Sequence, residues 1–359
     1  MKKLLFTTEH PAPYMDDLFD GISETFDVDV VYMEAASEEK NWALFKARFV
    51  GHLAQDISTL TLVRMIRETD LFIAGGWSSF FQVKAILIGL LTGTKTAVFS
   101  DAPNMDAKRR IVRRVQSVLL KGIPLYFVAG REAGRKFANT YWIKDLDRIK
   151  EFPYQSWLPD SGEVNQYTAR RKQALSGANE VVRVFIANRF IERKGYADIL
   201  DALQNLQSAG VMTACHFDIA GNGPDFEHYR EIFARDFPQV ELHGWIETED
   251  YRRLMLGCDV FVHASKFEPY GIPVVDACKC QKRVIATSGV CAAVDAKDAG
   301  CPVRLFEPGD GRALGALLEE AFTERHRLYD ATEIETAEVA FAPQLNLASI
   351  QEVLAPVQR

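Results

Sequence analysis

Two carboxylates, Glu268 and Asp276, stand eight positions apart in the second half of the chain, with a glycine and a proline between them. The preceding run Asp259–Ser265 is mostly apolar and predicts a buried strand, and a helix is expected from Pro273 because proline is favoured at the first helical position. We therefore expect Glu268 in a strand-to-helix loop and Asp276 in the first helical turn, where free N–H groups and the helix dipole favour an anionic ligand. Such a site suits a polyhydroxylated phosphate ester, for which a sugar nucleotide is the natural candidate. The alternative is that Asp276 is only a partner of the helix dipole.

Two cations follow the strand expected at Val181–Ala187. Arg189 leaves the end of this strand, and Lys194 opens the next helix. An arginine fork and a lysine point charge at this place could hold a diphosphate. The alternative is that both are solvated surface charges.

Two further loops of the second half follow predicted strands. Gly221 and Asn222 begin a Gly-Asn-Gly-Pro turn, which lacks the third glycine of a dinucleotide fingerprint and favours a tight turn that a ligand can approach closely. Trp245 and Ile246 follow the next strand, where an aromatic ring and backbone amides could frame a flat base. Simple packing of Trp245 is equally consistent with the sequence.

Strand-like and helix-like segments alternate along almost the whole chain. Continuous apolar strands separated by helices predict parallel sheets that are covered on both faces. Ligands of such sheets bind beyond the carboxyl ends of the strands. Strands are expected at Lys3–Thr8, Val28–Met33, Leu71–Ala74, Thr96–Ser100, Leu125–Ala129, Val181–Ala187, His216–Ala220, Val240–His243, Val260–His263, Arg283–Thr287 and Val303–Phe306. Helices are expected at Met15–Thr25, Ala43–Arg67, Ser78–Leu91, Asn104–Leu120, Lys194–Gln207, Asp225–Asp236, Thr248–Leu256, Pro273–Gln281, Asp310–Glu324 and Gln344–Val357.

The length of the chain and a polar stretch near its middle predict two domains of similar size. A chain of 359 residues exceeds one ordinary hydrophobic core. The polar stretch from about Tyr154 to Glu180 has no sustained period and is expected to be a linker. We predict Rossmann-like domains at 1–160 and 161–342, followed by a helix at 343–359 that can return to the first domain.

Composition narrows the class of protein. The chain is 48% hydrophobic and 25% charged, as in ordinary globular proteins, and its net charge of −7 argues against nucleic acid as a partner. The start of the chain does not resemble a signal peptide, and the longest apolar run, Ala85–Leu91, is shorter than the roughly 20 residues that span a bilayer. A cytoplasmic protein is expected. The six cysteines lack the spacing of paired zinc ligands and are expected to be small buried thiols, so no metal site is predicted.

Taken together, these motifs resemble glycosyltransferase family 4, and their order and spacing are far more specific than any one of them alone. The family has a GT-B fold, in which two Rossmann-like doubly wound domains face each other across a cleft, and it transfers sugars with retention. The layout of this α/β chain agrees with that fold along nearly its whole length. The matching segments are Arg189–Gly195, Gly221–Pro224, Val240–Gly244, Asp259–Ser265 and Glu268–Asp276.

The resemblance implies a role for each matching residue. Arg189 and Lys194 would hold the donor diphosphate, and Glu268 would contact the donor sugar. Asp276 would hydrogen-bond the ribose hydroxyls. The remaining donor-binding positions, which act largely through their backbone, would be Gly221 and Asn222, Trp245 and Ile246 at the base, and Tyr270, Gly271 and Ile272 at the sugar and the distal phosphate.

The chain departs from the family pattern at several positions. Asp276 replaces a glutamate, which shortens the reach by one methylene. Gln281 and Arg283 replace a glycine and a proline, and Pro269 stands where glycine is usual. No departure removes a charge that the chemistry needs, so an active enzyme is expected.

The acceptor side is expected in the first half of the chain. The loop after the first strand offers His10, Pro13 and Tyr14. Asp101 follows the strand Thr96–Ser100, and the resemblance places an acid or a histidine there, facing the point of transfer. The alternative for Asp101 is a helix N-cap or a turn acid.

The predicted helix 108–121 is amphipathic. Its apolar positions 111, 112, 115, 118 and 119 share one face, and Arg109, Arg110, Arg113 and Arg114 make the rest strongly basic. This concentration of charge suits anionic phospholipid or a lipid-diphosphate acceptor. The alternative is a helix whose apolar face packs on the core while its cationic side is solvated.

The sequence and the resemblance together imply a metal-independent hexosyltransferase that needs no cofactor. It would move a sugar from a nucleoside diphosphate, with UDP preferred and GDP-mannose as the alternative, to a hydroxyl of a glycan or lipid-linked glycan in cell-surface polysaccharide assembly. Its place would be the cytoplasm or the inner face of the membrane. The competing functions are a sugar-nucleotide 2-epimerase of the same fold and a non-catalytic subunit that binds sugar nucleotides. A dinucleotide-dependent oxidoreductase is disfavoured because no glycine fingerprint follows the first strand.

Overall fold

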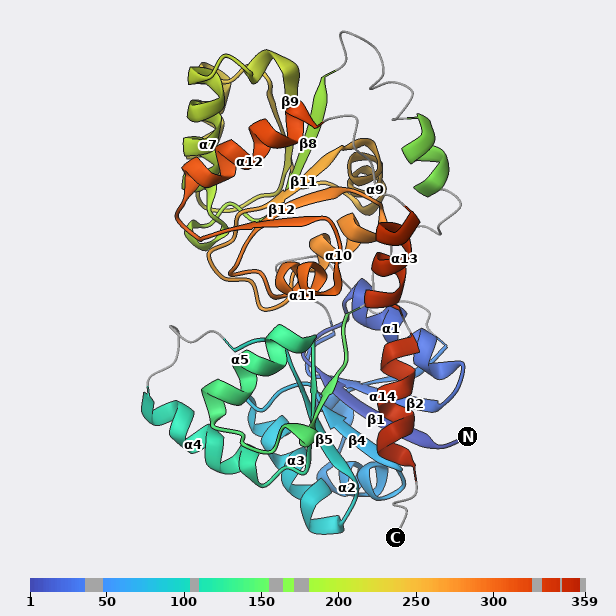
Figure 1. Ribbon diagram of the computed structural model, residues 1–359. Coiled ribbons are helices and arrows are strands. Elements are labelled where there is room, and N and C mark those ends of the chain that lie inside the picture. Colours follow the sequence, from blue (N-terminus) through green and yellow to red (C-terminus); the bar gives the residue numbers. More distant parts are fainter. Residues whose placement is uncertain are drawn as a thin grey trace. The chain divides into compact units, whose positions relative to one another are not determined.

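The computed structural model describes residues 1–35, 48–103, 110–154, 164–170, 181–324, 331–342 and 344–355. The chain divides into two compact units, Met1–Trp157 with Ala342–Arg359, and Leu158–Phe341. Each unit is built around one parallel β-sheet (Figure 1).

The sheet of the first unit has the strand order β3-β2-β1-β4-β5-β6-β7, and all neighbouring strands are parallel. The chain fills one half of the sheet outward from β1 and then the other half outward from β4, as in a Rossmann fold. Its strands are β1 (Lys3–Thr8), β2 (Asp27–Tyr32), β3 (Val50–Leu53), β4 (Leu71–Ala74), β5 (Thr96–Ser100), β6 (Leu125–Val128) and β7 (Ile149–Glu151). Its helices are α1 (Pro13–Ser23), α2 (Thr59–Arg67), α3 (Phe80–Thr92), α4 (Arg110–Lys121), α5 (Arg131–Tyr141) and α14 (Gln344–Leu354), with 3-10 turns η1 (Ala54–Asp56) and η2 (Leu146–Arg148).

The second unit repeats this topology with the strand order β10-β9-β8-β11-β12-β13, again all parallel. Its strands are β8 (Val182–Ala187), β9 (Cys215–Ala220), β10 (Val240–Gly244), β11 (Val260–His263), β12 (Arg283–Thr287) and β13 (Val303–Phe306). Its helices are α7 (Tyr196–Ser208), α8 (Phe226–Asp236), α9 (Thr248–Gly257), α10 (Ile272–Lys279), α11 (Cys291–Ala299), α12 (Gly311–Thr323) and α13 (Ala331–Ala340), with 3-10 turns η3 (Glu192–Lys194) and η4 (Met212–Ala214).

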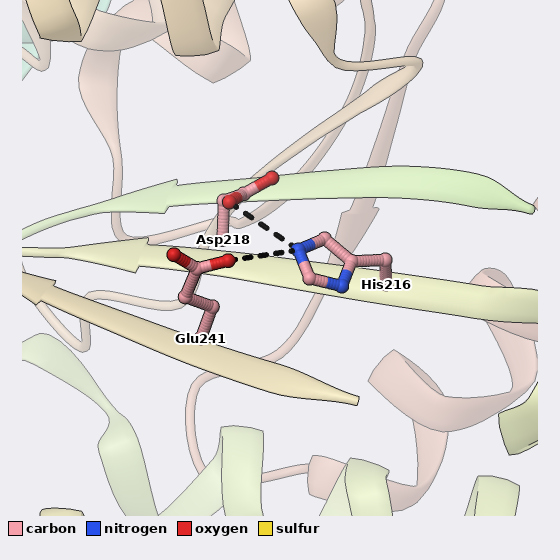
Figure 2. Close-up of side chains that lie close together, drawn as sticks. All are labelled: His216, Asp218 and Glu241. Carbon is pink, nitrogen blue, oxygen red and sulfur yellow. Dashed lines mark ion pairs between the residues drawn. The ribbon is translucent and has the colours of Figure 1, made fainter. Parts of the chain in front are cut away.

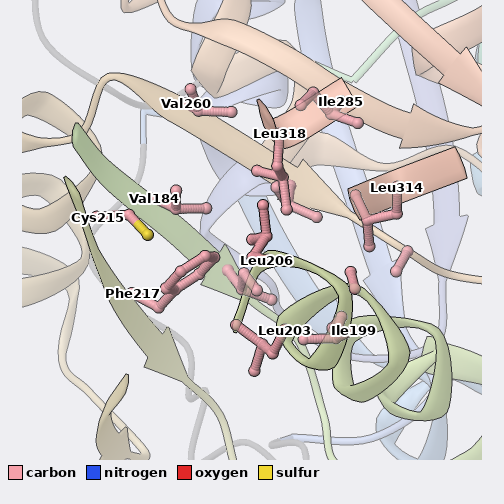
Figure 3. Close-up of a cluster of buried hydrophobic side chains, with 14 of the residues drawn as sticks. Val184, Ile199, Leu203, Leu206, Cys215, Phe217, Val260, Ile285, Leu314 and Leu318 are labelled. Atoms are coloured by element: carbon pink, nitrogen blue, oxygen red, sulfur yellow. The ribbon is translucent and has the colours of Figure 1, made fainter. Parts of the chain in front are cut away.

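One face of the second sheet carries the main core of its unit. Val184 of β8, Phe217 of β9 and Val260 of β11 are buried in one cluster with Leu203 of α7 and Leu318 of α12 (Figure 3). Successive strand residues point to opposite faces, so the residues between these apolar ones face away from α7 and α12. The opposite face carries buried aromatic residues on β8 and β11, Phe185 and Phe261, and polar side chains on β9 and β10.

Both sheets reverse their strand order at one place. The reversal lies between β1 and β4 in the first sheet and between β8 and β11 in the second. Crevices at the carboxyl ends of the strands form at such switch points and hold ligands in open α/β sheets. The loops after these four strands are consequently where a site is expected.

The helix expected at Ala43–Arg67 is confirmed for Thr59–Arg67 and wrong for the described residues before it. Residues Val50–Leu53 form strand β3 and pair with β2, and helix α2 begins only after Ser58, whose side chain accepts a hydrogen bond from the Thr61 N–H. The N-cap at Ser58 starts the helix later than the apolar pattern alone suggests. Residues 43–47 lie outside the described part of the chain.

The segment expected to be a linker also differs in its described part, because residues 164–170 are helical. The carboxy-terminal helix α14 is bonded to the strand β7 region of the first unit. The Asn346 amide donates to the Pro153 carbonyl at 2.9 Å, and the Ser349 hydroxyl donates to the Glu151 carbonyl at 2.7 Å. These bonds explain why α14 belongs to the first unit although it ends the chain.

All six cysteines are buried thiols, as the sequence predicts. Among the described helices, none combines the length and the apolar character that crossing a bilayer requires.

Candidate active site

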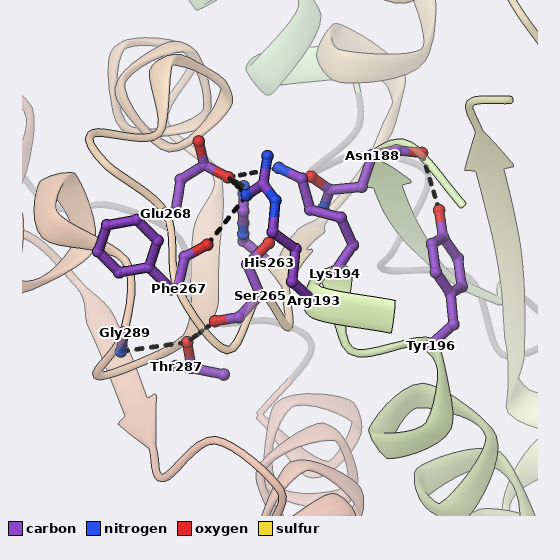
Figure 4. Close-up of polar contacts among 10 residues, drawn as sticks. All are labelled: Asn188, Arg193, Lys194, Tyr196, His263, Ser265, Phe267, Glu268, Thr287 and Gly289. Carbon is purple, nitrogen blue, oxygen red and sulfur yellow. Dashed lines mark hydrogen bonds and ion pairs between the residues drawn. The ribbon is translucent and has the colours of Figure 1, made fainter. Parts of the chain in front are cut away.

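A buried ion pair lies at the switch point of the second sheet. Lys194 ends the 3-10 turn η3 after β8, and its ammonium donates a hydrogen bond to the carboxylate of Glu268 in the loop after β11 (Figure 4). The side chains are only 10% and 17% exposed. Arg193 Nη1 lies 3.7 Å from the same carboxylate oxygen and donates at 3.1 Å to the Phe267 carbonyl. Glu268 lies in the predicted loop, whereas Lys194, which was expected to open the next helix, ends η3 just before Gly195, the N-cap of α7. The fold joins the two side chains.

Close packing of the two loops explains how the pair forms. Gly195 follows Lys194 with φ = 75°, and a Cβ added there would lie 2.0 Å from the Ala264 carbonyl oxygen at the end of β11. Only glycine allows that approach in the left-handed conformation. The Lys266 N–H also donates to the Arg193 carbonyl at 2.8 Å. The turn after β8 is therefore locked onto the loop that carries Glu268.

The charges of the site follow from burial and from each other. Burial acts to raise the pKa of Glu268, but the Lys194 ammonium, His263 and Arg193 outweigh it and hold the pKa of this carboxyl below its ordinary value. Burial lowers the pKa of Lys194; Glu268 opposes this shift, while Arg193 and Arg189 add to it. Burial, aided by Lys194, lowers the pKa of His263 to about 3. At neutral pH, Glu268 is ionised and His263 is neutral.

The loop of Glu268 is held by the segment that starts α11. The Glu268 N–H donates to the Gly289 carbonyl at 3.1 Å, and the Ala292 N–H donates to the Tyr270 carbonyl at 2.8 Å. Gly271 is the N-cap of α10 with φ = 110°. In the described part of the chain, the N–H groups of Gly271 and Ile272 have no hydrogen-bond acceptor. The start of α10 thus offers unpaired donors to an anion.

Three polar residues at this switch point were missed by the sequence interpretation. His263 Nδ1, Ser265 Oγ and Asn188 Nδ2 are buried and have no hydrogen-bond partner among the described residues. Buried polar atoms are normally paired, so atoms without a partner beside an open loop are candidate ligand contacts. The available signal was the position of each residue at or just after the end of an apolar strand.

Asp276 does not lie where the sequence placed it. Helix α10 begins at Ile272 with Pro273 second, so Asp276 falls in the second turn and no acid lies in the first. The residue is 1% exposed and accepts a hydrogen bond of 2.7 Å from the Tyr251 hydroxyl. The physical reason is that Gly271 ends the loop early and turns this position of the helix inward. Asp276 is consequently no partner of the first-turn dipole.

The substituted position Gln281 follows α10 with φ = 58°, a left-handed conformation that favours glycine. Its amide donates to the Asn165 side chain at 2.7 Å. Gln281, at the position of the family's glycine, thus adopts a backbone conformation that glycine favours.

The other predicted donor-side residues lie in loops beside the pair. Arg189 is exposed and close enough to Lys194 to affect its pKa. A Cβ added at Gly221 would lie 1.8 Å from the Asn188 carbonyl oxygen, so a neighbouring backbone, rather than a ligand, accounts for this glycine. The Phe190 N–H donates to the Asn222 carbonyl at 2.9 Å, which joins the same two loops.

Trp245 is 56% exposed and Ile246 is half-buried. Simple packing therefore does not account for the indole of Trp245. The loop after β10 leaves an aromatic surface open to a ligand.

The first unit has a cavity of about 410 Å³ at its own switch point. It brings together His10, Tyr14 and Asp101, which the sequence predicted for the acceptor side. The Tyr154 hydroxyl donates to the Asp101 carboxylate at 2.6 Å, and the rings of Tyr14 and Tyr154 are 5.2 Å apart. Further walls are formed by Trp77, Phe99, Tyr141 and Phe152.

Asp101 lies well before the described start of α4 at Arg110, so no described helix uses it as an N-cap. Pro13 is the first residue of α1, and its side chain lies outside the described part of the structure.

Helix α4 presents its apolar residues to the outside of its unit. Ser117 is buried, and its hydroxyl donates to the Tyr141 carbonyl at 3.1 Å, while Leu120 is fully buried. The alternative in which the apolar face packs on the core is therefore wrong for most of that face. Residues 108 and 109 and the side chain of Arg110 lie outside the described part. The exposed apolar side chains are Ile111 at 74%, Val112 at 45%, Val115 at 66% and Val118 at 75%.

The second unit matches a known protein family. Residues 168–335 match the family described as "Glycosyl transferases group 1". The matched segment contains Lys194, Glu268 and Asp276. No curated protein matches the chain significantly.

Solved structures resemble the chain along nearly its whole length. Alr3699/HepE from Anabaena in complex with UDP and glucose is 17% identical with a TM-score of 0.71, covering 99% of this chain and 100% of its own. Sucrose-phosphate synthase from Thermosynechococcus elongatus is 13% identical with a TM-score of 0.70, covering 99% of each chain. WaaG, a glycosyltransferase involved in lipopolysaccharide biosynthesis, is 14% identical with a TM-score of 0.63, covering 98% of each chain.

At identities this low, the likeness establishes the fold alone. The chain has the GT-B fold with two Rossmann-like α/β domains, and the predicted fold class is confirmed. The resemblance to glycosyltransferases is confirmed at the level of the group 1 match in the second unit.

Proposed function

We propose that the protein is a retaining, metal-independent glycosyltransferase of family 4 that moves a hexose from a nucleoside diphosphate to a hydroxyl of a glycan or lipid-linked glycan. The observation that carries this proposal is the buried Lys194–Glu268 pair, with Arg193 beside it, at the switch point of the unit that matches the family. A fixed cation beside a fixed anion suits a donor that has both a diphosphate and a polyhydroxylated ring.

The reaction separates charge, and the site stabilises the charges that develop. The bond from the sugar C1 to the phosphate oxygen breaks, its electron pair stays on the diphosphate, and the sugar becomes cationic. Lys194 and Arg189 stabilise the departing diphosphate, and the unpaired N–H groups at the start of α10 add to this. Removing one such contact typically costs about 10²–10³ in rate.

Retention follows if the acceptor attacks from the face that the diphosphate leaves. The acceptor hydroxyl forms the new bond to C1, and its proton passes to the departing phosphate oxygen. Glu268 is ionised and held by two cations, so its role is to orient the donor sugar by accepting hydrogen bonds, without a covalent intermediate.

A UDP-sugar is the proposed donor. Crystal structures of the related Anabaena protein are described as complexes with UDP and with UDP-glucose. The exposed Trp245 after β10 offers a surface on which a uracil ring can stack. GDP-mannose remains the alternative donor.

Asp276 has a ribose-binding role in this proposal only if the ribose replaces its present partner. The carboxylate accepts the Tyr251 hydroxyl and is 1% exposed. Binding of the donor would exchange this hydrogen bond for bonds to the ribose hydroxyls. Tyr251 therefore competes with the ribose for the same carboxylate.

The proposed acceptor site is the cavity of the first unit. Aromatic walls suit the apolar face of a sugar ring, and the Asp101 carboxylate, oriented by Tyr154, can accept a hydrogen bond from the attacking hydroxyl. Replacing Asp101 by Asn should lower the transfer rate and leave UDP affinity unchanged. Equal losses of both would contradict an acceptor-side role.

We also propose that α4 docks the enzyme on the anionic inner face of the membrane, as a partner in cell-surface polysaccharide assembly. Its exposed valines and isoleucine lie beside Arg114, the pattern of a helix that lies in the interface. Val115→Ser with Val118→Ser should abolish partitioning onto anionic liposomes, whereas Leu60→Ser, an equally exposed apolar change on α2, should not. Unchanged partitioning of the double variant would refute the docking role.

The decisive experiment for the function is a transfer assay with purified protein and a panel of sugar nucleotides. The expected result is release of UDP only when an acceptor glycan is present, with a product whose NMR anomeric configuration equals that of the donor. Conversion of the donor without an acceptor would favour the 2-epimerase. Tight binding of sugar nucleotides without turnover on any acceptor would favour the non-catalytic subunit.

A further inference from the structure

A second group of chemically active side chains lies at the β10 edge of the second sheet, on the face opposite the core under α7 and α12. His216 and Asp218 alternate along β9, and Glu241 and His243 alternate along the neighbouring edge strand β10. In the register of the two strands, Glu241 stands opposite Asp218. All four point away from the core face that holds Phe217, because residues two apart on a strand share a face.

The distances within this group are those of metal ligands. His216 Nε2 lies 3.4 Å from Asp218 Oδ1 and 3.6 Å from Glu241 Oε2 (Figure 2). Two ligand atoms of a tetrahedral zinc ion, each about 2.0–2.2 Å from the metal, are about 3.3–3.6 Å apart. The three ligand atoms all lie within 4.8 Å of one another. Because the Glu241 side chain is 60% exposed, it is free to close the remaining gap.

A local irregularity of β10 brings the fourth side chain to the group. The register of β10 against β9 shifts between Leu242 and Gly244, so His243 sits at a bulge. Bulges commonly re-aim side chains. His243 Nε2 lies 2.8 Å from Asp218 Oδ1, and its Nδ1 lies 3.7 Å from Glu241 Oε1. The imidazole thus hydrogen-bonds Asp218 and can orient this carboxylate as an outer partner of the ligands.

We propose that His216, Asp218 and Glu241 bind a zinc ion, with water in the fourth position and His243 orienting the Asp218 carboxylate. An imidazole nitrogen with carboxylate oxygens suits zinc, whereas Mg²⁺ prefers an octahedral set of oxygens. Two carboxylates balance the charge of a divalent ion. The neighbouring cation in register is Arg183 of β8, whose side chain is exposed to solvent.

The proposed zinc ion links the edge strand β10 to its neighbour β9. β10 pairs with β9 alone, and it leads directly into the loop of Trp245. A metal bridge between the two strands therefore holds the position of that loop. This consequence depends on the strand pairing and is independent of the proposed transfer reaction.

The test is titration of full-length, chelator-treated protein with zinc chloride in a calorimeter. One zinc ion per chain is expected, and Mg²⁺ should neither bind nor compete. His216→Ala and Glu241→Gln, both at partly exposed positions, should each weaken binding at least tenfold. Loss of an orienting partner typically weakens a metal site 10–100-fold, and His243→Ala should do the same. The matched control is His228→Ala, an exposed histidine of α8 outside the group, which should bind zinc like the unchanged protein.

Two further readouts separate this site from binding elsewhere. Cobalt substituted for zinc should show no thiolate-to-metal absorption, because the proposed ligands include no cysteine and all six cysteines are buried. Amide hydrogen exchange in Val240–Gly244 should slow when zinc is added and should not slow in His216→Ala. Zinc binding that survives His216→Ala and Glu241→Gln unchanged, or the absence of stoichiometric binding, would overturn the proposal.

Discussion

The most informative perturbation is Lys194→Ala, because it removes the main counter-charge of a buried carboxylate. Lys194 is 10% exposed at its side chain and donates to Glu268, whose side chain is 17% exposed. Removing one partner of a buried pair typically costs about 3–5 kcal/mol. Arg193 remains 3.7 Å from the carboxylate, so we expect the lower end of that range, about 3 kcal/mol.

The same change should alter the response of the second unit to acid. The folded-state pKa of Glu268 is depressed, so its contribution to stability is present above the unfolded-state pKa and is lost as pH falls through the folded value. Without the Lys194 ammonium, the depression of the Glu268 pKa is smaller, so this contribution shrinks. Urea unfolding of the variant should therefore depend less on pH in the acidic range than unfolding of the unchanged protein.

Activity and stability can be separated by a second variant. Lys194→Ala should lower transfer by about 10²–10³ and weaken UDP binding. Lys194→Met combined with Glu268→Gln removes both charges, so it should regain stability but not transfer. Lys266→Ala is the matched control, because this exposed lysine pairs only loosely with Glu192 at 3.4 Å, and it should change stability by no more than about 0.5 kcal/mol. Near-normal turnover in a folded Lys194→Ala protein, or recovery of transfer in the double variant, would refute the assignment.

Three further predictions follow from particular contacts. Gly195→Ala should destabilise the second unit by more than about 1 kcal/mol in urea unfolding, because φ = 75° and the Ala264 carbonyl oxygen leave no room for a Cβ; an unchanged midpoint would contradict this. The folded-state pKa of His263 is about 3 and the ordinary value is 6.5, so the unfolded chain binds more protons between these values and stability falls as pH drops through that window. His263→Asn should remove a pH-dependent loss of at most about 5 kcal/mol, and an unaltered pH profile would exclude this role. Tyr251→Phe should cost about 1–3 kcal/mol of stability and leave UDP binding at least as tight, since it frees Asp276; weaker binding would show that Tyr251 does not compete with the ribose.

The sequence alone predicted those strands and loops whose position is set by neighbouring residues. The strands of the second unit carry continuous apolar runs, and every strand predicted there exists within a residue or so of its expected bounds. Glu268 could be placed in a loop after a strand, and Lys194 near the start of the following helix, because a strand end and a helix start are read from neighbouring residues. The same reasoning failed for β3, where pairing with β2 overrode a helix-like apolar pattern.

Only the tertiary structure decided which of these residues meet. Lys194 and Glu268 are 74 positions apart, and their contact exists because β8 and β11 are neighbours in the sheet. No local pattern encodes that strand order. The inward turn of Asp276 and the outward apolar face of α4 likewise depend on which surfaces their helices cover, which is a property of the whole unit. The sequence therefore determined the chemical groups and the elements that carry them, whereas burial, charge state and partnership arose from long-range packing.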